Sequence, residues 1–190
     1  MRALGLFVGV LVAAAGARAA DDISVETIRR DSAVEVRCLA TLQAPLELIW
    51  RALTDYNRLA EFIPGMRSSR LLERRGPIAV VEQSGEVRFL FLSFPIEVTL
   101  ASVERPPHAI DVYALKGNLK RFEGGYRVEP RDRGQMLLRW QGIIEPEAPM
   151  PPLIGELLMR AAIEDQFRGM VREIERRDAL RREREKETAQ

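Results

Sequence analysis

The sequence predicts an α+β domain in which one antiparallel sheet packs against a long C-terminal helix. The first observation is a series of segments in which apolar and polar residues alternate, the pattern of half-buried strands. The second is that short turns separate consecutive segments, which favours antiparallel neighbours over parallel crossovers. The third is a proline-free stretch from Leu153 onward that repeats apolar residues at helical spacing. A chain of 190 residues has room for one such domain.

The domain is expected to open with a strand and two helices. Residues 33–42 alternate between apolar and polar side chains, which predicts the strand. Pro45 suits the first turn of a helix, because its missing N–H would have no helical partner there. The apolar stripe predicted for this helix consists of Leu46, Ile49, Trp50 and Leu53. Asn57 and the Pro64-Gly65 pair then predict a short second helix that ends in a loop.

Six more strands are predicted before the last helix: 67–75, 78–92, 93–103, 110–115, 119–129 and 135–145. Together with the first strand they make seven. Their alternation places Phe94 and Ile96 on one face and Glu97 on the other, and it groups Phe122 with Tyr126.

The last helix is expected to begin at Leu153 and to continue into a charged tail, 178–190. Its predicted apolar face consists of Leu153, Leu157, Ala161, Phe167, Val171 and Ile174. Arg and Glu alternate in the tail at spacings that stabilise a solvated helix. We interpret the tail as a continuation of the helix, with a docking segment as the alternative; its mixed charge argues against membrane binding by a polybasic tail.

Residues 1–19 have the three parts of a secretory signal peptide. Arg2 supplies the basic start, residues 4–12 form an apolar run, and residues 17–19 read Ala-Arg-Ala. The apolar run is shorter than the about 20 residues that cross a bilayer. We therefore predict cleavage between Ala19 and Ala20, and a protein that is secreted across the inner membrane into the periplasm. A buried N-terminal helix is the alternative.

Composition narrows the possible chemistry. A formal net charge of +1 offers no electrostatic footprint for nucleic acid. One cysteine, Cys38, excludes an internal disulfide and a thiolate zinc site, and one histidine, His108, excludes a site built from several histidines. The sequence predicts no metal site and no cofactor.

Other polar candidates have simple interpretations. His108 follows two prolines in a turn and is expected at the surface. Buried glutamates would serve acid–base chemistry, but Glu82, Glu86 and Glu97 alternate as on any solvated strand face. Basic residues at 67, 70, 74 and 75 are expected along a solvated sheet edge. No catalytic residue is predicted.

Large apolar side chains gather on one predicted sheet face, opposite the last helix: Phe94, Ile96, Phe122, Tyr126 and Trp140, with Ile154, Leu158 and Met159 from the helix. They either fill a solid core or line a ligand cavity, and periodicity alone does not separate these alternatives. Gly124 lies between Phe122 and Tyr126 on this face, which leaves room for a ligand or a bend.

Three segments carry a resemblance to a known family: 50–56 (WRALTDY), 61–65 (EFIPG) and 117–126 (GNLKRFEGGY). Over about residues 32–177, the chain resembles the polyketide cyclase/dehydrase and lipid transport group of the START-like superfamily, including coenzyme-Q-binding-like domains. The resemblance implies the helix-grip fold of START and Bet v 1-like proteins, in which a curved seven-stranded antiparallel sheet encloses an apolar cavity against the C-terminal helix. A signal peptide departs from the intracellular coenzyme-Q-binding and aromatase members, and favours an envelope lipid or another apolar molecule as ligand.

The function that we expect is that of an exported carrier for a lipid-like or other apolar small molecule. A cofactor-free cyclase or dehydratase and a START-like protein-interaction module are the alternatives. The loop at 62–65 and the start of the last helix are expected to gate the cavity. The protein is also expected to contact a membrane transiently. The expected ligand-binding residues are Phe62, Phe94, Ile96, Phe122, Tyr126, Trp140, Ile154 and Leu158.

Overall fold

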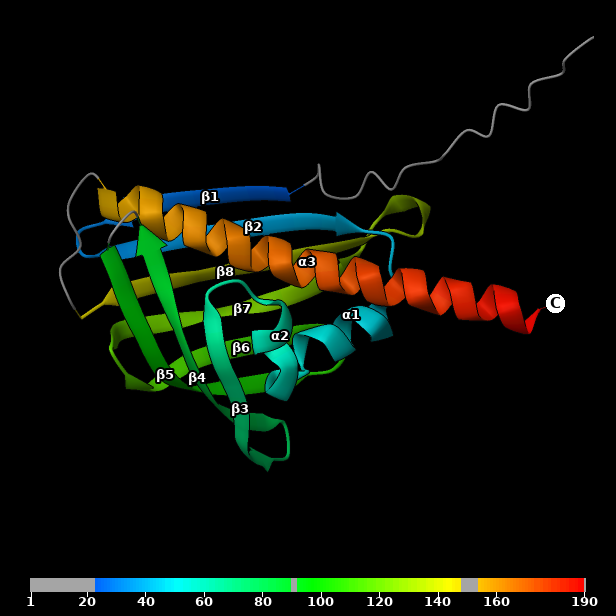
Figure 1. Ribbon diagram of the computed structural model, residues 1–190, viewed down its shortest axis with the longest axis horizontal. Helices are drawn as coiled ribbons and strands as arrows, with labels where there is room; N and C mark the ends of the chain where they lie inside the picture. Colours follow the sequence, from blue (N-terminus) through cyan, green and yellow to red (C-terminus); the bar gives the residue numbers. More distant parts are fainter. Residues whose placement is uncertain (1–22, 90–91, 148–153, 190) are drawn as a thin grey trace, which may run out of the picture.

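An antiparallel sheet curves around one long helix in the computed structural model, which describes residues 23–89, 92–147 and 154–189 (Figure 1). The strands are β1 (Ile23–Arg30), β2 (Ala33–Leu42), β3 (Met66–Arg75), β4 (Ile78–Phe89), β5 (Leu92–Arg105), β6 (Ala109–Gly117), β7 (Leu119–Pro130) and β8 (Met136–Pro146). The helices are α1 (Leu46–Leu53), α2 (Leu59–Phe62) and α3 (Ile154–Thr188), with short 3-10 turns η1 (Tyr56–Arg58) and η2 (Asp132–Gly134). The predicted leader, residues 1–19, lies outside the described residues.

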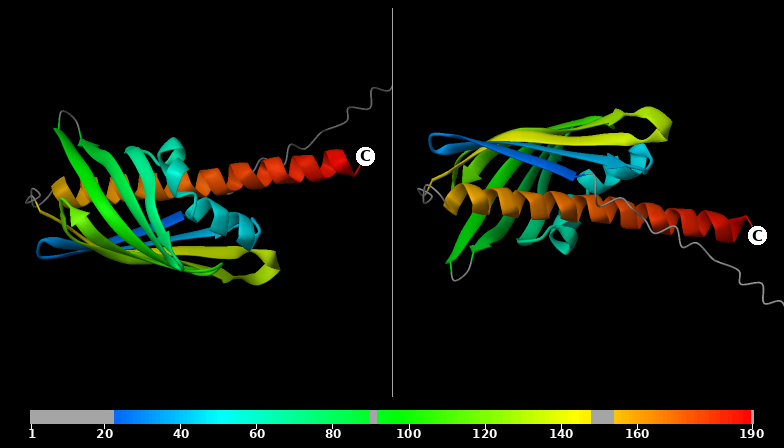
Figure 2. Two further views of the ribbon diagram at one scale, coloured as in Figure 1. Left: turned by 90° about the horizontal axis from the view of Figure 1, so that it is seen from below. Right: turned by 90° about the horizontal axis from the view of Figure 1, so that it is seen from above.

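The strands follow the order β1-β2-β8-β7-β6-β5-β4-β3. Consecutive strands from β3 to β8 form hairpins, and β2 pairs with β8, so α1 and α2 carry the chain across to the opposite edge of the sheet. The two views of Figure 2 show the sheet bending around one side of α3. The α+β class and the helix-grip architecture that the sequence predicted are confirmed.

Strand β1 is the element that the sequence prediction missed. It pairs with β2 along its length, from Ile23 opposite Ala40 to Arg30 opposite Ala33. Its alternation is weak, because Val25 is buried while Ile28 is 52% exposed on the other face. The sheet in the described residues therefore has eight strands, not seven, and it begins at Ile23 instead of the predicted start at residue 32.

Helix α3 runs to Thr188, through most of the charged tail that the sequence analysis interpreted as its continuation. Asp178 is 5% exposed and forms ion pairs with Arg181 (2.9 Å) and Arg182 (2.6 Å). Arg182 also donates a hydrogen bond to the Gln43 carbonyl. The start of the predicted tail is thus a packed part of the helix, and the later turns project beyond α1 (Figure 1).

The apolar face predicted for α3 is correct in its second half and wrong near its start. Phe167, Val171 and Ile174 are buried, but Leu157 is 62% exposed and Leu158 is buried in its place. Residues four apart advance about 40° around a helix at each step, so the predicted row 153, 157, 161 turns away from the core. Leu153 lies outside the described residues.

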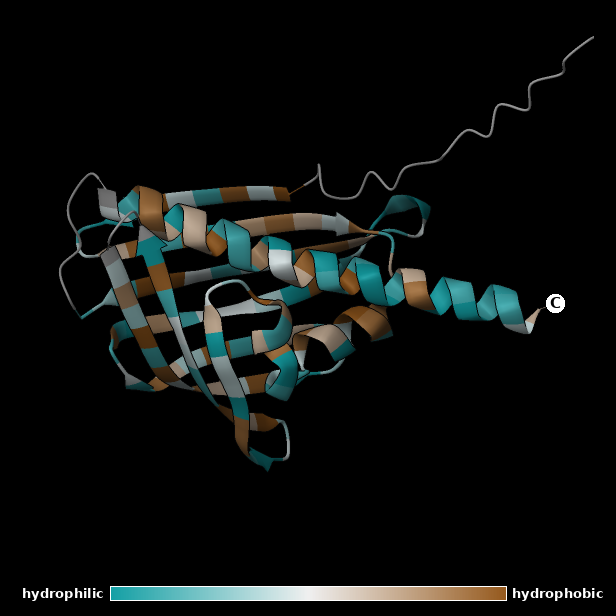
Figure 3. Ribbon diagram, in the orientation of Figure 1, coloured by the Kyte–Doolittle hydropathy of each residue, from teal (hydrophilic) through white to brown (hydrophobic). Residues whose placement is uncertain are grey.

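The face of α1 also differs from the predicted stripe. Leu48, Ile49, Ala52 and Leu53 are buried, whereas Leu46 and Trp50 are half-buried. Apolar and polar residues alternate along the strands (Figure 3), and the apolar faces meet α1 and α3 in one core. No helix in the described ranges has a stretch long and apolar enough to span a membrane.

Candidate functional site

A cavity of about 160 Å³ lies between the concave face of the sheet and α3. Strands β2 to β8, helices α1 to α3 and the turn η1 contribute to its wall. The lining residues are Cys38, Leu53, Tyr56, Leu59, Ile63, Met66, Gln83, Leu100, Ser102, Ile110, Val112, Phe122, Tyr126, Trp140, Ile144, Ile163, Gln166, Phe167 and Met170. Period-two alternation along the strands and the helical repeat direct these side chains to the inner side of the curved sheet.

The floor of the cavity contains one row of register partners on four adjacent strands. Cys38 on β2 lies opposite Trp140 on β8, Trp140 opposite Tyr126 on β7, and Tyr126 opposite Ile110 on β6. Side chains in one such row of a sheet point to the same face and are close neighbours. The row therefore brings together a thiol, an indole and a phenol from distant parts of the sequence.

Two glycines lie beside this row, where Gly124 on β7 is the register partner of Gly142 on β8. A Cβ on Gly124 would lie 2.6 Å from the Gln141 carbonyl oxygen, so the two strand backbones approach too closely for any side chain there. A Cβ on Gly142 would lie 3.2 Å from the Trp140 indole, which is tilted against Phe122 with 6.4 Å between the ring centroids. The sequence left open a ligand or a bend at Gly124, and the structure has a close strand approach there.

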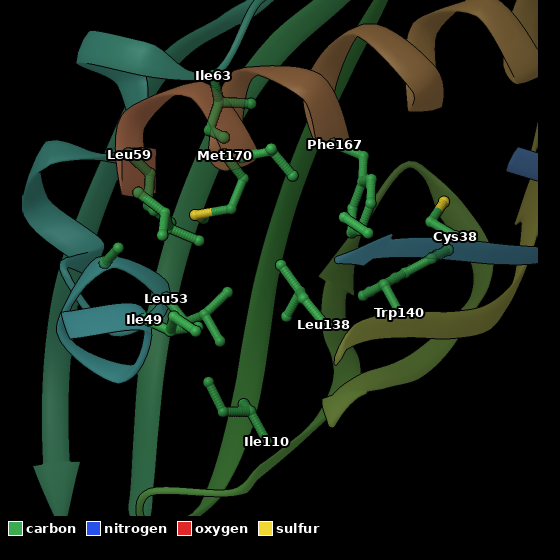
Figure 4. Packing of buried hydrophobic residues seen from close by; sticks show 14 of the residues in the cluster. Cys38, Ile49, Leu53, Leu59, Ile63, Ile110, Leu138, Trp140, Phe167 and Met170 are labelled. Atoms are coloured by element: carbon green, nitrogen blue, oxygen red, sulfur yellow. The ribbon is translucent and has the colours of Figure 1, made fainter. Parts of the chain in front are cut away.

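Side chains from the helices close the cavity from the opposite side. Phe167 and Met170 of α3 are 4% and 3% exposed. Leu59 and Ile63 extend from α2 and the residue after it toward the same interior, as Figure 4 shows. These contacts make the lining predominantly apolar.

A partly buried ionic network lies behind one end of the wall and reaches it through Tyr56. The Tyr56 hydroxyl donates to Glu104 (2.9 Å), and Arg74 forms an ion pair with the same carboxylate (2.8 Å). Glu104 is 7% exposed, and the ion pair with Arg74 offsets part of the cost of burying its carboxylate. Burial, followed by the charge of Glu104, raises the pKa of Tyr56. Tyr56 is therefore held as a neutral hydrogen-bond donor.

The other titratable groups of the lining are also uncharged. Burial raises the pKa of the Cys38 thiol to about 12, and it raises the pKa of Tyr126 as well. Within the described part of the chain, no carboxylate, histidine, lysine or arginine lines the cavity. General acid–base catalysis needs a group whose pKa lies near the working pH, and these groups lie far above it.

The predicted binding residues fall into three groups. Phe122, Tyr126 and Trp140 line the cavity. Phe62 and Ile96 pack against the edge of the core, and Phe94 lies half-buried further along β5, opposite Val87. Leu158 is buried but faces a separate groove, and the side chain of Ile154 lies outside the described residues.

That groove, which we call the α3 groove, has a volume of about 680 Å³. It is bounded by Pro64–Arg67, by Glu86–Arg88 at the end of β4, and by α3 between Leu157 and Gln166. Met66 and Gln166 line both the groove and the cavity. The loop and helix start that the sequence predicted as a gate therefore border a groove next to the cavity.

Other hollows are lined by charged residues. One of about 500 Å³ lies on the outer face of the sheet, among residues that include Arg37, Asp111 and Arg127. Another, of about 770 Å³, lies between α1 and the end of α3, where Arg51 and Arg181 contribute. Both hollows are open to water, so an apolar ligand would lose less contact with water there than in the cavity.

The remaining polar candidates lie away from the cavity. His108 is exposed, with its ring 3.3 Å from the Val128 carbonyl. Glu82 and Glu86 form ion pairs with Arg70 and Arg67 of the edge strand β3. The same strand carries Arg74 and Arg75, so the basic residues do lie on a sheet edge, as the sequence predicted.

The sequence prediction missed most of the cavity lining. Cys38, Phe167 and the alternating residues of β6 had the right periodicity but no signal that separates cavity from solid core. Tyr56, Gln83, Ser102 and Gln166 had no sequence signal at all, because register and tertiary packing bring them to the wall.

Comparisons with known proteins agree with this architecture. Residues 42–174 match the family described as polyketide cyclase/dehydrase and lipid transport. No curated protein is significantly similar to the chain in sequence.

Solved structures share the fold at low sequence identity. The Zhui aromatase/cyclase from Streptomyces sp. R1128 is 19% identical, with a TM-score of 0.64 over 76% of this chain and 95% of that one. A START superfamily protein from Mycobacterium smegmatis is 16% identical, with a TM-score of 0.63 over 75% and 97%. A STAR-related lipid transfer protein from Xanthomonas axonopodis is 13% identical, with a TM-score of 0.61 over 82% and 99%.

At these identities the neighbours support the fold alone, whereas the family match spans most of the sheet, α1, α2 and α3 as far as Ile174. A sheet curved around a C-terminal helix is the arrangement that the resemblance implied. The chain belongs to the polyketide cyclase/dehydrase and lipid transport family.

Proposed function

We propose that the protein binds a small, largely apolar molecule in the cavity between the sheet and α3, and carries it without changing it chemically. The observation that supports this proposal is an apolar cavity with no charged group in its described lining. Moving a ligand from water into such a cavity contributes about 25 cal/mol for each Å² of apolar surface removed from water.

The cavity volume limits the ligand. An apolar cavity of about 150 Å³ holds benzene, so about 160 Å³ accommodates one ring with few substituents. A longer, lipid-like molecule would place one end in the cavity and the remainder along the α3 groove, past Met66 and Gln166. Movement of these two side chains would then admit the ligand.

Cyclase or dehydratase chemistry is the second candidate, because solved neighbours include proteins named as aromatase/cyclases. Such reactions use general acids and bases. Tyr56, Tyr126 and Cys38 are the titratable groups of the described lining, and burial raises the pKa of each. This arrangement favours a carrier over an enzyme.

We also propose that the protein works in the periplasm after removal of residues 1–19, and that it takes up and releases its ligand during transient contact with a membrane. The signal-peptide pattern supports the first part. The exposed Leu157 beside the α3 groove supports the second.

The experiment is native mass spectrometry of the full protein purified from the envelope of its own host, followed by organic extraction. We expect one small apolar molecule per chain, recovered unchanged after prolonged incubation with fresh protein. Chemical conversion of the extracted molecule would contradict the carrier function. Absence of any adduct, together with no binding of an added aromatic probe, would contradict a binding function altogether.

A further inference from the structure

Two hydrogen-bond donors of the cavity lining have no partner among the described residues. Neither the Tyr126 hydroxyl nor the Trp140 indole N–H forms a hydrogen bond with any described residue. In the described part of the protein, Glu175 Oε1 is the one fully buried side-chain oxygen or nitrogen without a partner. The donors of Tyr126 and Trp140 are therefore open to a molecule of water size.

That opening leads to the cavity. Trp140 is only 8% exposed, and both residues line the cavity wall. Tyr126 is half-buried, and burial raises the pKa of its hydroxyl. Because the two residues are register partners on β7 and β8, their donors belong to one patch of the floor.

Unpartnered donors in an apolar enclosure are costly unless something accepts their hydrogen bonds. Buried polar groups in native proteins nearly always have a partner, either protein or bound molecule. Cys38, a weak S–H donor, lies on the other side of Trp140 in the same row. The side-chain amide of Gln166 faces the cavity from α3 and also forms no hydrogen bond with a described residue.

We propose that Tyr126 and Trp140 form a recognition site for an uncharged oxygen acceptor, so that the ligand is a neutral, oxygen-bearing ring or headgroup. This inference rests on the proposed function and defines the class of ligand. A pure hydrocarbon would leave both donors unpaired. A carboxylate would be buried without a cation, because the described lining contains no arginine or lysine.

Three probes of similar shape separate these classes: acetophenone, which has a neutral carbonyl; isopropylbenzene, which has no oxygen; and benzoate, which is an anion. Binding to the full protein is measured by NMR titration of the wild type, of Tyr126→Phe and of Tyr113→Phe. Tyr113 is the matched control, because it is 47% exposed on the outer face of β6.

We expect Tyr126→Phe to weaken acetophenone binding by about fivefold to tenfold, the loss of one neutral hydrogen bond. Isopropylbenzene binding should change by less than about twofold, and Tyr113→Phe should change neither. The infrared band of the bound acetophenone carbonyl should shift toward that of the non-hydrogen-bonded ketone in Tyr126→Phe alone. In the wild type, benzoate should bind at least about 100-fold more weakly than acetophenone.

Equal weakening of acetophenone and isopropylbenzene, or no weakening of either, would overturn the recognition site while leaving the binding function in place. Benzoate binding as tight as acetophenone would overturn it as well, and this comparison needs no variant. If the wild type binds none of the three probes, the proposed binding function itself fails.

Discussion

Tyr126 on β7 lies directly opposite Trp140 on β8, and both side chains line the cavity between the sheet and α3 without a hydrogen bond to any described residue. The sheet register produces this pairing, because alternate residues of neighbouring strands share the concave face. The helix α3 covers that face with Phe167 and Met170, both of which are buried. Fold and candidate site are thus consequences of the same arrangement.

Helix α1 offers a test of how its residues pack. Ile49→Ala should lower the free energy of unfolding by about 2–5 kcal/mol, because Ile49 is fully buried and its truncation leaves a cavity. The neighbouring Trp50→Ala should cost less, although tryptophan is larger, because Trp50 is half-buried. Urea denaturation of both variants measures the difference, and a larger cost for Trp50→Ala would show that the helix is turned differently.

A close contact between α3 and the loop after α2 predicts whether a substitution at Gly169 raises or lowers stability. A Cβ on Gly169 would lie 2.6 Å from the Phe62 carbonyl oxygen and 2.5 Å from the Pro64 ring. Gly169→Ala should therefore lower stability by about 1–3 kcal/mol through overpacking, although alanine is the better helix former.

The control for this prediction is Ala161→Gly, at an exposed position of the same helix. Helix propensity alone should lower its unfolding free energy by about 1 kcal/mol. Thermal unfolding of both proteins is the measurement. A more stable Gly169→Ala protein would mean that α3 does not approach the loop this closely.

The arginine contacts of Glu173 predict that the stability of the fold depends on pH. Two hydrogen bonds from Arg176 (2.6 and 2.8 Å) and one from Arg177 (2.7 Å) lower the pKa of Glu173 to about 2 against the energetic cost of burial. Since the folded-state pKa lies below the ordinary value of 4.5, the stabilisation is complete above about pH 4.5 and is lost as pH falls toward 2.

The variant Glu173→Gln should lose this contribution, so its unfolding free energy should fall less steeply over the same pH range. Urea unfolding at several pH values compares the two slopes. Parallel slopes for wild type and variant would contradict the role assigned to the Glu173 carboxylate.

Export is tested at the N-terminus. The mature chain in the envelope fraction should begin at Ala20, because the Ala-Arg-Ala sequence at 17–19 suits signal peptidase. Ala19→Leu should block this cleavage and leave a heavier protein. Intact-mass measurement distinguishes the two, and an envelope protein that begins at Met1 would contradict the prediction.

Much of the fold was readable from the sequence because its strands are half-buried and alternate strongly. The prediction of a strand at 33–42 coincides with β2, and the six later strands match within a few residues. Strand β1 was missed because an outward-facing isoleucine, Ile28, obscures its alternation. Helix α3 was found, but Leu157 was wrongly placed on its apolar face, whereas Leu158, also expected toward the sheet, is buried.

The site was only partly predictable, for a physical reason. Alternation identifies which residues face inward, as it did for Phe122, Tyr126 and Trp140, but it does not show how completely a helix fills the space opposite them. That depends on α3, which packs with Phe167 and Met170 inward and leaves a gap beside them. The polar part of the wall depends on tertiary contacts such as the one between Tyr56 and Glu104.

The measurement that tests the central claim most directly is an NMR titration with isopropylbenzene of the wild type and two valine variants. Val112→Phe adds a ring to the cavity wall on β6, whereas Val103→Phe adds the same ring to the outer face of the adjacent strand β5. We predict saturable shifts at cavity residues in the wild type, at least about tenfold weaker binding in Val112→Phe, and a change below about twofold in Val103→Phe. Equal binding by the wild type and a folded Val112→Phe protein, or no binding by the wild type, would contradict the account.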